Sequence, residues 1–186
     1  ALHINIILRM LELVIEEAAL APSAIVGREL YKFGAAVVAA VCGSLRGPEV
    51  FKMDLAGLRA HIHLGRDGVI PSNLMKKGTD LTEAPHVFLA FLGKFKGELD
   101  VQQHLVAIAS TTQSGIDARW WIEKLIEVRA QEGCTHGPAF GVSATRASTC
   151  RKYDDTLHHF LEIIQNENSG LIDASDDFRA NYRFFR

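Results

Sequence analysis

The most informative stretch of the sequence is GSLRGPEVFKMDL, residues 43–55. It opens with Gly43, a residue that readily ends a helix, directly after a long apolar segment. A polar interruption follows, in which Arg46 stands three residues before Glu49. We therefore expect a buried helix to end near Gly43 and a short helix to begin just after Arg46.

Two helices are predicted upstream of this stretch. Residues 2–20 are rich in Leu, Ile and Glu and end at the breaker Ala21-Pro22-Ser23. Residues 28–42 carry large apolar side chains at helical spacing, with alanines on the remaining faces. A helix that is apolar nearly all round is a core helix. The apolar residues of this second helix are Leu30, Phe33, Val37, Val38 and Val41.

Downstream, three short segments predict strands. Residues 58–64 alternate between apolar and polar side chains, which is typical of a half-buried strand. Residues 87–92 are continuously apolar and predict a buried strand, and residues 104–109 predict a third. A polar hairpin over residues 93–103 joins the last two. These strands predict a three-stranded antiparallel sheet.

Helical patterns return in the last third of the chain. The stretch 114–117 has the spacing of a capping box and predicts a helix to about Gln131. Residues 153–164 predict another, with Asp154 and Asp155 in its first turn, where the helix dipole favours acidic groups. A final helix is expected near Ser175. The fold class predicted for residues 1–186 is therefore α+β and mostly helical, a single domain with helices packed around a small sheet.

Composition narrows the functions to consider. The 186 residues are 48% hydrophobic and 23% charged, which is globular rather than disordered composition. The formal net charge of −2 excludes a generic nucleic-acid-binding surface, so any phosphate binding must depend on a local site. The longest uncharged apolar stretch, residues 33–45, is shorter than the roughly 20 residues that span a membrane. Three widely spaced cysteines favour reduced thiols and a cytoplasmic or nuclear location.

Arg46 is the first candidate for chemistry. A guanidinium presents its donors in a rigid fork that suits a phosphate or a carboxylate, and a nearby Glu49 could orient it. The plainer alternative is a surface ion pair between the two residues, worth about 0.3–0.5 kcal/mol. No cysteine or histidine spacing typical of zinc sites and no glycine-rich phosphate loop is present, so no metal or cofactor is expected.

Residues 43–55 resemble the first arginine box of the tyrosine recombinases, the phage integrase family. The residues that match that box in order are Gly43, Leu45, Arg46, Glu49 and Asp54. The predicted strands, their hairpin and the loop at residues 137–140 resemble the elements that follow the box in that family. The resemblance covers the chain from about Leu30 to its end. The long polar insert between the first two strands, residues 67–83, departs from it.

The resemblance implies DNA breaking and rejoining, in site-specific recombination or DNA integration, by tyrosine-type transesterification. Arg46 would brace the scissile phosphate and Glu49 would orient Arg46. Lys94 would be the hairpin lysine that protonates the leaving oxygen, with Lys96 as the other candidate and as a DNA contact. The implied partner is double-stranded DNA, bound by a homo-oligomer of the full-length protein. No membrane partner is implied.

The second half of the family's active site is incomplete in this sequence. No second arginine box precedes any of the three tyrosines, Tyr31, Tyr153 and Tyr182. A basic face formed by Arg179, Arg183 and Arg186 lies roughly where that box begins in the family, and Arg183 and Arg186 are candidate DNA contacts. We therefore expect a catalytic domain truncated before its second arginine, with residues 1–27 as a lead-in helix and no DNA cleavage by this segment alone.

Two alternatives come from other classes of protein. One is a non-catalytic DNA-binding module with the recombinase fold. The other is an α+β interaction protein with no nucleic-acid role, in which Arg46 and Glu49 form only an ion pair.

Overall fold

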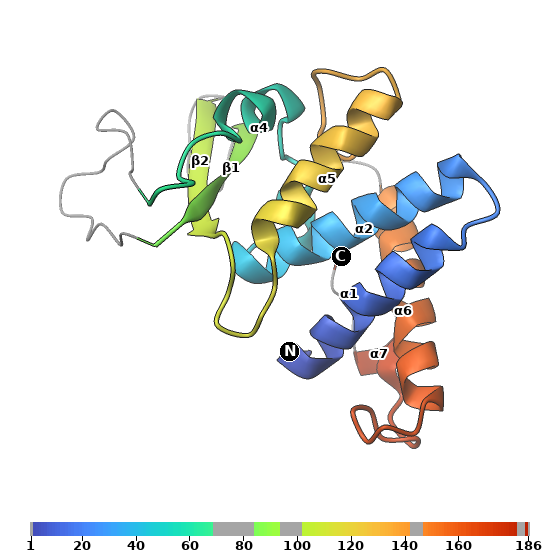
Figure 1. The fold of residues 1–186 in the computed structure, drawn as a ribbon. Coiled ribbons are helices and arrows are strands. Elements are labelled where there is room, and N and C mark those ends of the chain that lie inside the picture. Colours follow the sequence, from blue (N-terminus) through green and yellow to red (C-terminus); the bar gives the residue numbers. More distant parts are fainter. Residues whose placement is uncertain (1, 69–83, 94–101, 142–146, 182–184, 186) are drawn as a thin grey trace.

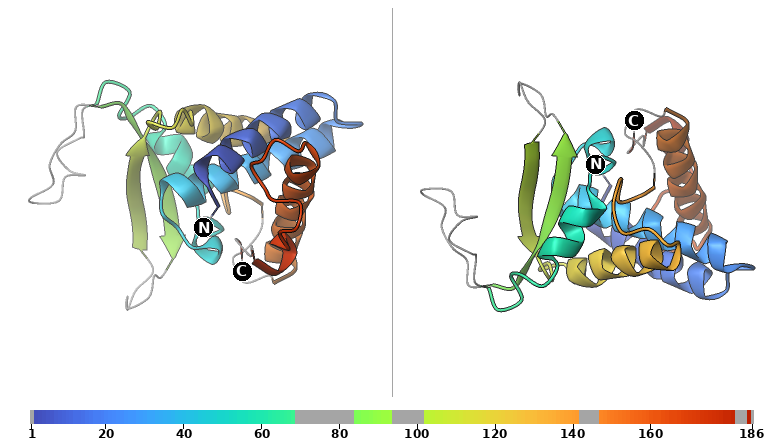
Figure 2. Two further views of the ribbon diagram at one scale, coloured as in Figure 1. Left: turned by 90° about the horizontal axis from the view of Figure 1, so that it is seen from below. Right: turned by 90° about the horizontal axis from the view of Figure 1, so that it is seen from above.

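The computed structural model describes residues 2–68, 84–93, 102–141, 147–181 and 185, and shows an α+β fold that is mostly helical, as the sequence predicts (Figure 1). Its elements in chain order are α1 Ile4–Ala19, α2 Ala24–Cys42, α3 Gly47–Val50, α4 Leu55–His61, β1 His86–Gly93, β2 Gln102–Ala109, α5 Ala118–Gln131, α6 Ala147–Asn166 and α7 Phe178–Asn181. Figure 2 shows the small sheet at one end of the molecule and α6 at the other, with α1, α2 and α5 between them.

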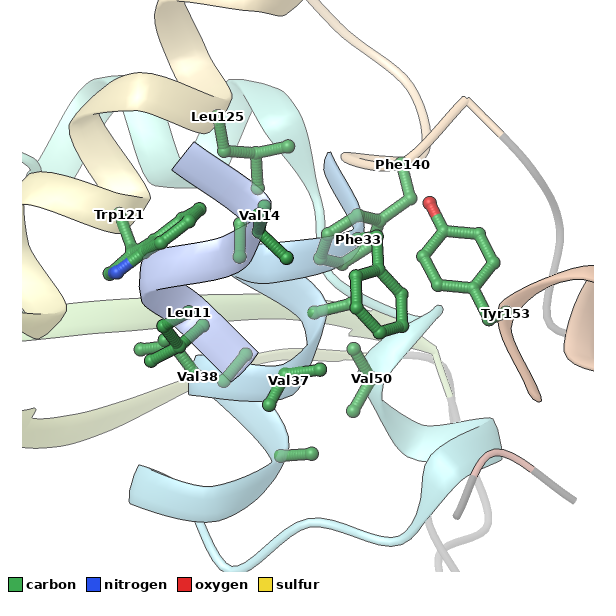
Figure 3. Packing of buried hydrophobic residues seen from close by; sticks show 14 of the residues in the cluster. Leu11, Val14, Phe33, Val37, Val38, Val50, Trp121, Leu125, Phe140 and Tyr153 are labelled. Carbon is green, nitrogen blue, oxygen red and sulfur yellow. The ribbon is translucent and has the colours of Figure 1, made fainter. Parts of the chain in front are cut away.

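Helix α2 is the centre of the core. It packs against α1 on one side and α5 on another, and residues 33–40 are all buried. Its small residues let neighbouring helices approach closely, because Gly34 faces the ring of Trp121 from α5. Figure 3 shows Phe33 of α2 in one apolar cluster with Val14 of α1 and Leu125 of α5. The prediction of a core helix that is apolar nearly all round is confirmed.

An ammonium group lies inside this core. Lys32 is only 5% exposed, and its ammonium donates to Glu132 at 2.9 Å, across from α2 to the end of α5. Glu29 forms a second ion pair with Lys32, and Arg129 pairs with Glu132. A buried ammonium is tolerated only when it is paired and hydrogen-bonded, so this cluster ties α2 to α5.

Replacing Glu132 with glutamine should reduce the loss of unfolding free energy as the pH falls from about 7 to about 3. Burial opposes ionisation of Glu132, but hydrogen bonds from Lys32 and Arg129 outweigh it and lower the pKa below the ordinary 4.5. A lowered pKa contributes stability above the unfolded-state value, and this contribution is lost as pH falls through the folded-state value. We expect Glu132→Gln to cost about 1–3 kcal/mol of unfolding free energy at pH 7 and much less near pH 3.

Urea denaturation across this pH range measures the effect. Glu127→Gln on α5 is the matched control, because Glu127 is exposed and its contacts with Lys124 and Gln131 lie at the surface. Curves for Glu132→Gln and wild type that run parallel from pH 7 to pH 3 would show that the cluster does not stabilise the fold through its charge.

The sheet consists of β1 and β2, paired antiparallel from His86 opposite Ala109 to Gly93 opposite Gln102. Strand β1 is buried along residues 86–91, as its continuous apolar run predicts. Helices α4 and α5 both pack against it. The two strands predicted from residues 87–92 and 104–109 are therefore confirmed.

The third predicted strand is wrong: residues 58–64 do not form one. They lie in α4 and the turns after it, because the Asp54 carboxylate caps this helix by accepting from Gly57 N at 2.8 Å. Leu55 and Leu58, three residues apart on one helical face, are fully buried, while Ala60 is exposed. The alternating pattern thus coincides with a helical one, and the sheet has two strands among the described residues instead of three.

A different segment lies along the free edge of β1. Met53 forms an isolated antiparallel bridge with Phe91, supported by a hydrogen bond from Asp54 N to Ala90 O at 2.9 Å. On its other side, Met53 O accepts from Ala139 N at 2.8 Å. The residues immediately after α3 therefore hold the sheet and the loop at residues 137–139 together.

Two details of the later helices also differ from expectation. Asp117 rather than Ser114 caps α5, by accepting from Trp120 N at 2.9 Å. Helix α6 begins at Ala147, so Asp154 lies in its interior rather than in its first turn, and it is only 1% exposed. Asp155 also lies in the interior of α6, so the dipole interpretation of both aspartates is wrong.

Candidate functional site

A tight turn at the end of α2 leads to Arg46. Leu45 N donates to Ala40 O at 2.9 Å and Ser44 N to Val41 O at 3.4 Å, the two bonds of a Schellman motif. Ser44 takes the left-handed conformation, with φ 51°, that this motif requires and that glycine normally supplies. The turn ends α2 and starts α3 within four residues, as the sequence predicts.

Arg46 occupies the N-cap position of α3. Its backbone N–H donates to Glu49 Oε2 at 2.8 Å, while its carbonyl accepts from Glu49 N at 2.9 Å. Glu49 therefore fixes the backbone of Arg46. Arg46 itself is exposed, and within the described part of the chain its guanidinium has neither a hydrogen bond nor an ion pair. The structure thus shows no Arg46–Glu49 ion pair.

The end of β1 lies beside the segment that follows α3. Leu92 N donates to Lys52 O at 3.1 Å, and Gly93 is adjacent to the side chain of Lys52. Gly93 is the last described residue before the hairpin that carries Lys94 and Lys96, and both lysines lie outside the described residues. The structure therefore brings the start of this hairpin next to the arginine box.

A shallow pocket marks the same place on the surface. It has a volume of about 240 Å³. Its lining comes from three separate parts of the chain: Phe51, Lys52, Met53 and Asp54, then Leu92, then Gly137 and Pro138. The pocket thus lies where the arginine box, the end of β1 and the loop at residues 137–138 meet.

The next candidates are the predicted DNA contacts near the end of the chain. Arg183 and Arg186 lie outside the described residues. Arg179, on the same predicted basic face, is exposed and pairs with Glu162 of α6 at 3.3 Å.

Neither described tyrosine is placed to act as a nucleophile. Tyr153 is 5% exposed among the aromatic rings of the core, and burial raises its pKa well above the ordinary range. Tyr31 is half-buried and lies against Trp120 and Trp121. Tyr182 lies outside the described residues.

The aromatic cluster beneath α3 escaped prediction. Phe185 is fully buried, its ring centroid lies 5.8 Å from that of Phe51, and its N–H donates to Asp154 Oδ1 at 2.9 Å. No sequence pattern connects Asp154 with Phe185, because they are 31 residues apart. The position of Asp154 next to Tyr153, and three residues before Leu157, in an apolar helical pattern was the available sequence signal.

Metal and thiol chemistry find no support in the described residues. No group of three His, Cys, Asp or Glu side chains there is arranged to hold a metal ion. Cys42, Cys134 and Cys150 form no disulfide with one another. No helix in the described ranges is both long and apolar enough to cross a membrane.

Comparison with known proteins gives no assignment. The sequence matches no protein-family model, no curated protein and no solved structure. The functional argument therefore rests on the residues and their geometry.

Proposed function

We propose that this chain supplies part of the active site of a DNA breaking and rejoining protein that works by tyrosine-type transesterification. In this proposal Arg46 contacts a non-bridging oxygen of the scissile phosphate, and the hairpin after Gly93 brings in the acid, Lys94 or Lys96. Residues 1–186 hold only part of the machinery, so this segment alone binds DNA without cutting it.

The observation that supports the proposal most directly is the state of Arg46. A guanidinium that served only the fold would be expected to bind a carboxylate or a carbonyl, as those of Arg119 and Arg129 do. The guanidinium of Arg46 instead faces solvent, while Glu49 holds both the backbone N–H and the backbone carbonyl of Arg46. A guanidinium on a fixed backbone, with its N–H donors pointing to solvent, suits a ligand with paired oxygens, such as a phosphate.

A second observation is the way three distant segments converge. The hydrogen bond from Leu92 to Lys52 and the bridge between Asp54 and Pro138 bring the end of β1 and the loop at residues 137–138 to the arginine box. Phosphoryl transfer depends on donors arranged in advance around the reacting phosphate, and residues on several segments provide such an arrangement. This convergence supports a shared site for Arg46 and the hairpin lysine.

Arg46→Ala is expected to weaken binding of a fluorescein-labelled DNA duplex about tenfold and to reduce the slope of log affinity against log salt by about 1. One lost phosphate contact accounts for both effects. Fluorescence anisotropy titrations between about 50 and 200 mM salt measure them. Because the net charge is −2, the titrations should begin at the low-salt end.

Arg66→Ala is the matched control for this substitution. Arg66 is also an exposed arginine, but it pairs with Glu123. The residue before it, Gly65, contacts the opposite end of β1, where Gly65 O accepts from His86 N. Equal losses for Arg46→Ala and Arg66→Ala would contradict a phosphate contact at Arg46. Salt-independent or absent binding by the wild type would favour an interaction protein with no nucleic-acid role.

A nicked suicide duplex tests the catalytic part. We expect no covalent complex with residues 1–186 on a denaturing gel. A covalent product would show that these residues already contain a working nucleophile, contrary to the proposal.

A further inference from the structure

The short helix α3 depends on its neighbours for its position. It has a single turn, and an isolated turn of helix is unstable because nucleation is unfavourable. Its C-cap residue, Phe51, is 2% exposed. Phe51 is therefore one of the residues that hold α3 in place, beside the hydrogen bonds of Lys52 and Met53 to β1 and the loop at residues 137–139, and the contacts of its ring fix the position of Phe51.

Three aromatic rings surround Phe51. The ring centroid of Phe51 lies 5.0 Å from Tyr153, 5.9 Å from Phe140 and 5.8 Å from Phe185. Figure 3 shows Phe140 and Tyr153 of this cluster, together with Phe33 of α2 and Val50 of α3. The contacts with Tyr153 and Phe140 are edge-to-face, and the ring of Phe185 is tilted by 44°. Aromatic pairs of this kind contribute more than the burial of area alone.

Phe185 differs from the other rings because a buried aspartate side chain holds its backbone. Its N–H donates at 2.9 Å to Oδ1 of Asp154, which is 1% exposed in the interior of α6. A buried carboxylate forms strong hydrogen bonds and orients its donors closely. Phe185 is thereby fixed at both ends, by the carboxylate at its backbone and by Phe33, Phe51 and Tyr153 at its ring.

The remaining step connects α3 with Arg46. The Arg46 carbonyl accepts from Glu49 N at 2.9 Å and from Val50 N at 3.3 Å, so the Arg46 backbone moves with this helix. We propose that Phe185 and Asp154 are positioning residues for Arg46: Asp154 fixes Phe185, Phe185 supports Phe51, and Phe51 fixes α3. As a statement about DNA, this inference rests on the function proposed above.

Amide hydrogen exchange tests the structural half without DNA. Phe185→Leu and Asp154→Ala should each speed exchange of the amides of Glu49, Val50 and Lys52 by about tenfold, because α3 opens more often. Phe160→Leu is the matched control. Phe160 is also fully buried and stacks on Phe33, but its ring contacts do not include Phe51, so it should leave these amides unchanged.

Equal exchange in α3 for Phe185→Leu and Phe160→Leu would overturn the proposal, since the effect would then be general loosening of the core. If Phe185→Leu does not fold, as judged by circular dichroism, Phe185→Met takes its place, because the flexible methionine side chain fills an irregular space more readily.

A double-mutant cycle tests the connection to Arg46. Phe185→Leu should weaken binding of the labelled duplex about threefold to fivefold in the wild-type background and not at all in the Arg46→Ala background. A loss that persists without Arg46 would overturn the positioning role. If Arg46→Ala alone leaves affinity unchanged, the proposed function fails, and the exchange measurement still decides whether Phe185 and Asp154 hold α3.

Discussion

Arg119→Ala is expected to lower the free energy of unfolding by about 3–5 kcal/mol. The Arg119 guanidinium, with its side chain 13% exposed, donates to the carbonyls of Ile62 at 2.6 Å, Leu64 at 3.0 Å and His86. Alanine would leave these part-buried carbonyls without this donor, and each such loss costs about 1–3 kcal/mol. The turn after α4 would also lose one of its attachments to the start of β1 and keep the hydrogen bond from His86 N to Gly65 O.

Two further variants make the measurement specific. Arg119→Lys should recover only part of the loss, because an ammonium cannot reproduce the planar fork that reaches separate carbonyls. Arg66→Ala removes an exposed arginine from the same region, with its side chain 61% exposed, and should change stability by less than about 1 kcal/mol. Urea denaturation followed by circular dichroism compares them. A loss below that of Arg66→Ala would show that the Arg119 bonds contribute little.

Gly34→Ala is expected to destabilise the protein by about 3 kcal/mol or more. A Cβ at this position would lie 2.2 Å from Trp121 Cζ3 and 2.5 Å from Cη2, well inside van der Waals contact. Neither partner has room to move, because Trp121 is 3% exposed and α2 is buried around it. The two helices would have to separate along the contact that joins the centre of the core.

Gly27→Ala on the same helix is the control. Its nearest neighbour would be Ala18 O at 3.2 Å, and alanine gains up to about 1 kcal/mol over glycine in a helix. We expect little change or a small gain in stability. The double variant Gly34→Ala, Trp121→Phe should recover part of the loss by returning space to the contact. Equal unfolding midpoints for Gly34→Ala and Gly27→Ala would contradict the close approach.

The sequence predicted those elements whose apolar pattern has a single interpretation. The apolar run that forms β1 and the apolar positions of α2 and α6 each match one periodicity over enough residues to exclude the other. Residues 58–64 do not, because Leu58, Ile62 and Leu64 satisfy a strand pattern while Leu55, Leu58 and Ile62 satisfy a helical one. Asp54 as a helix cap was the local signal that distinguishes the two.

For the candidate site, the sequence predicted local order but not distant contacts. The end of a helix, Arg46 and a short helix lie in the predicted order because Gly43 and the polar interruption act within a few residues. The pairing of Met53 with Phe91 and the bond from Phe185 to Asp154 join residues 38 and 31 positions apart. Such contacts depend on how whole elements pack, and no short motif records them.

The ladder around Met53 also bears on how the chain folds. Helices α1 and α2 are neighbours in sequence and pack together, so their pairing closes only a short loop. Met53, in contrast, joins β1 through Phe91 and the loop at Ala139, which lies 86 residues away. Contacts of such long separation form late because their loop entropy must be overcome first. We therefore expect the helical hairpin to assemble early and the surface around Arg46 to be among the last parts of the protein to take its native shape.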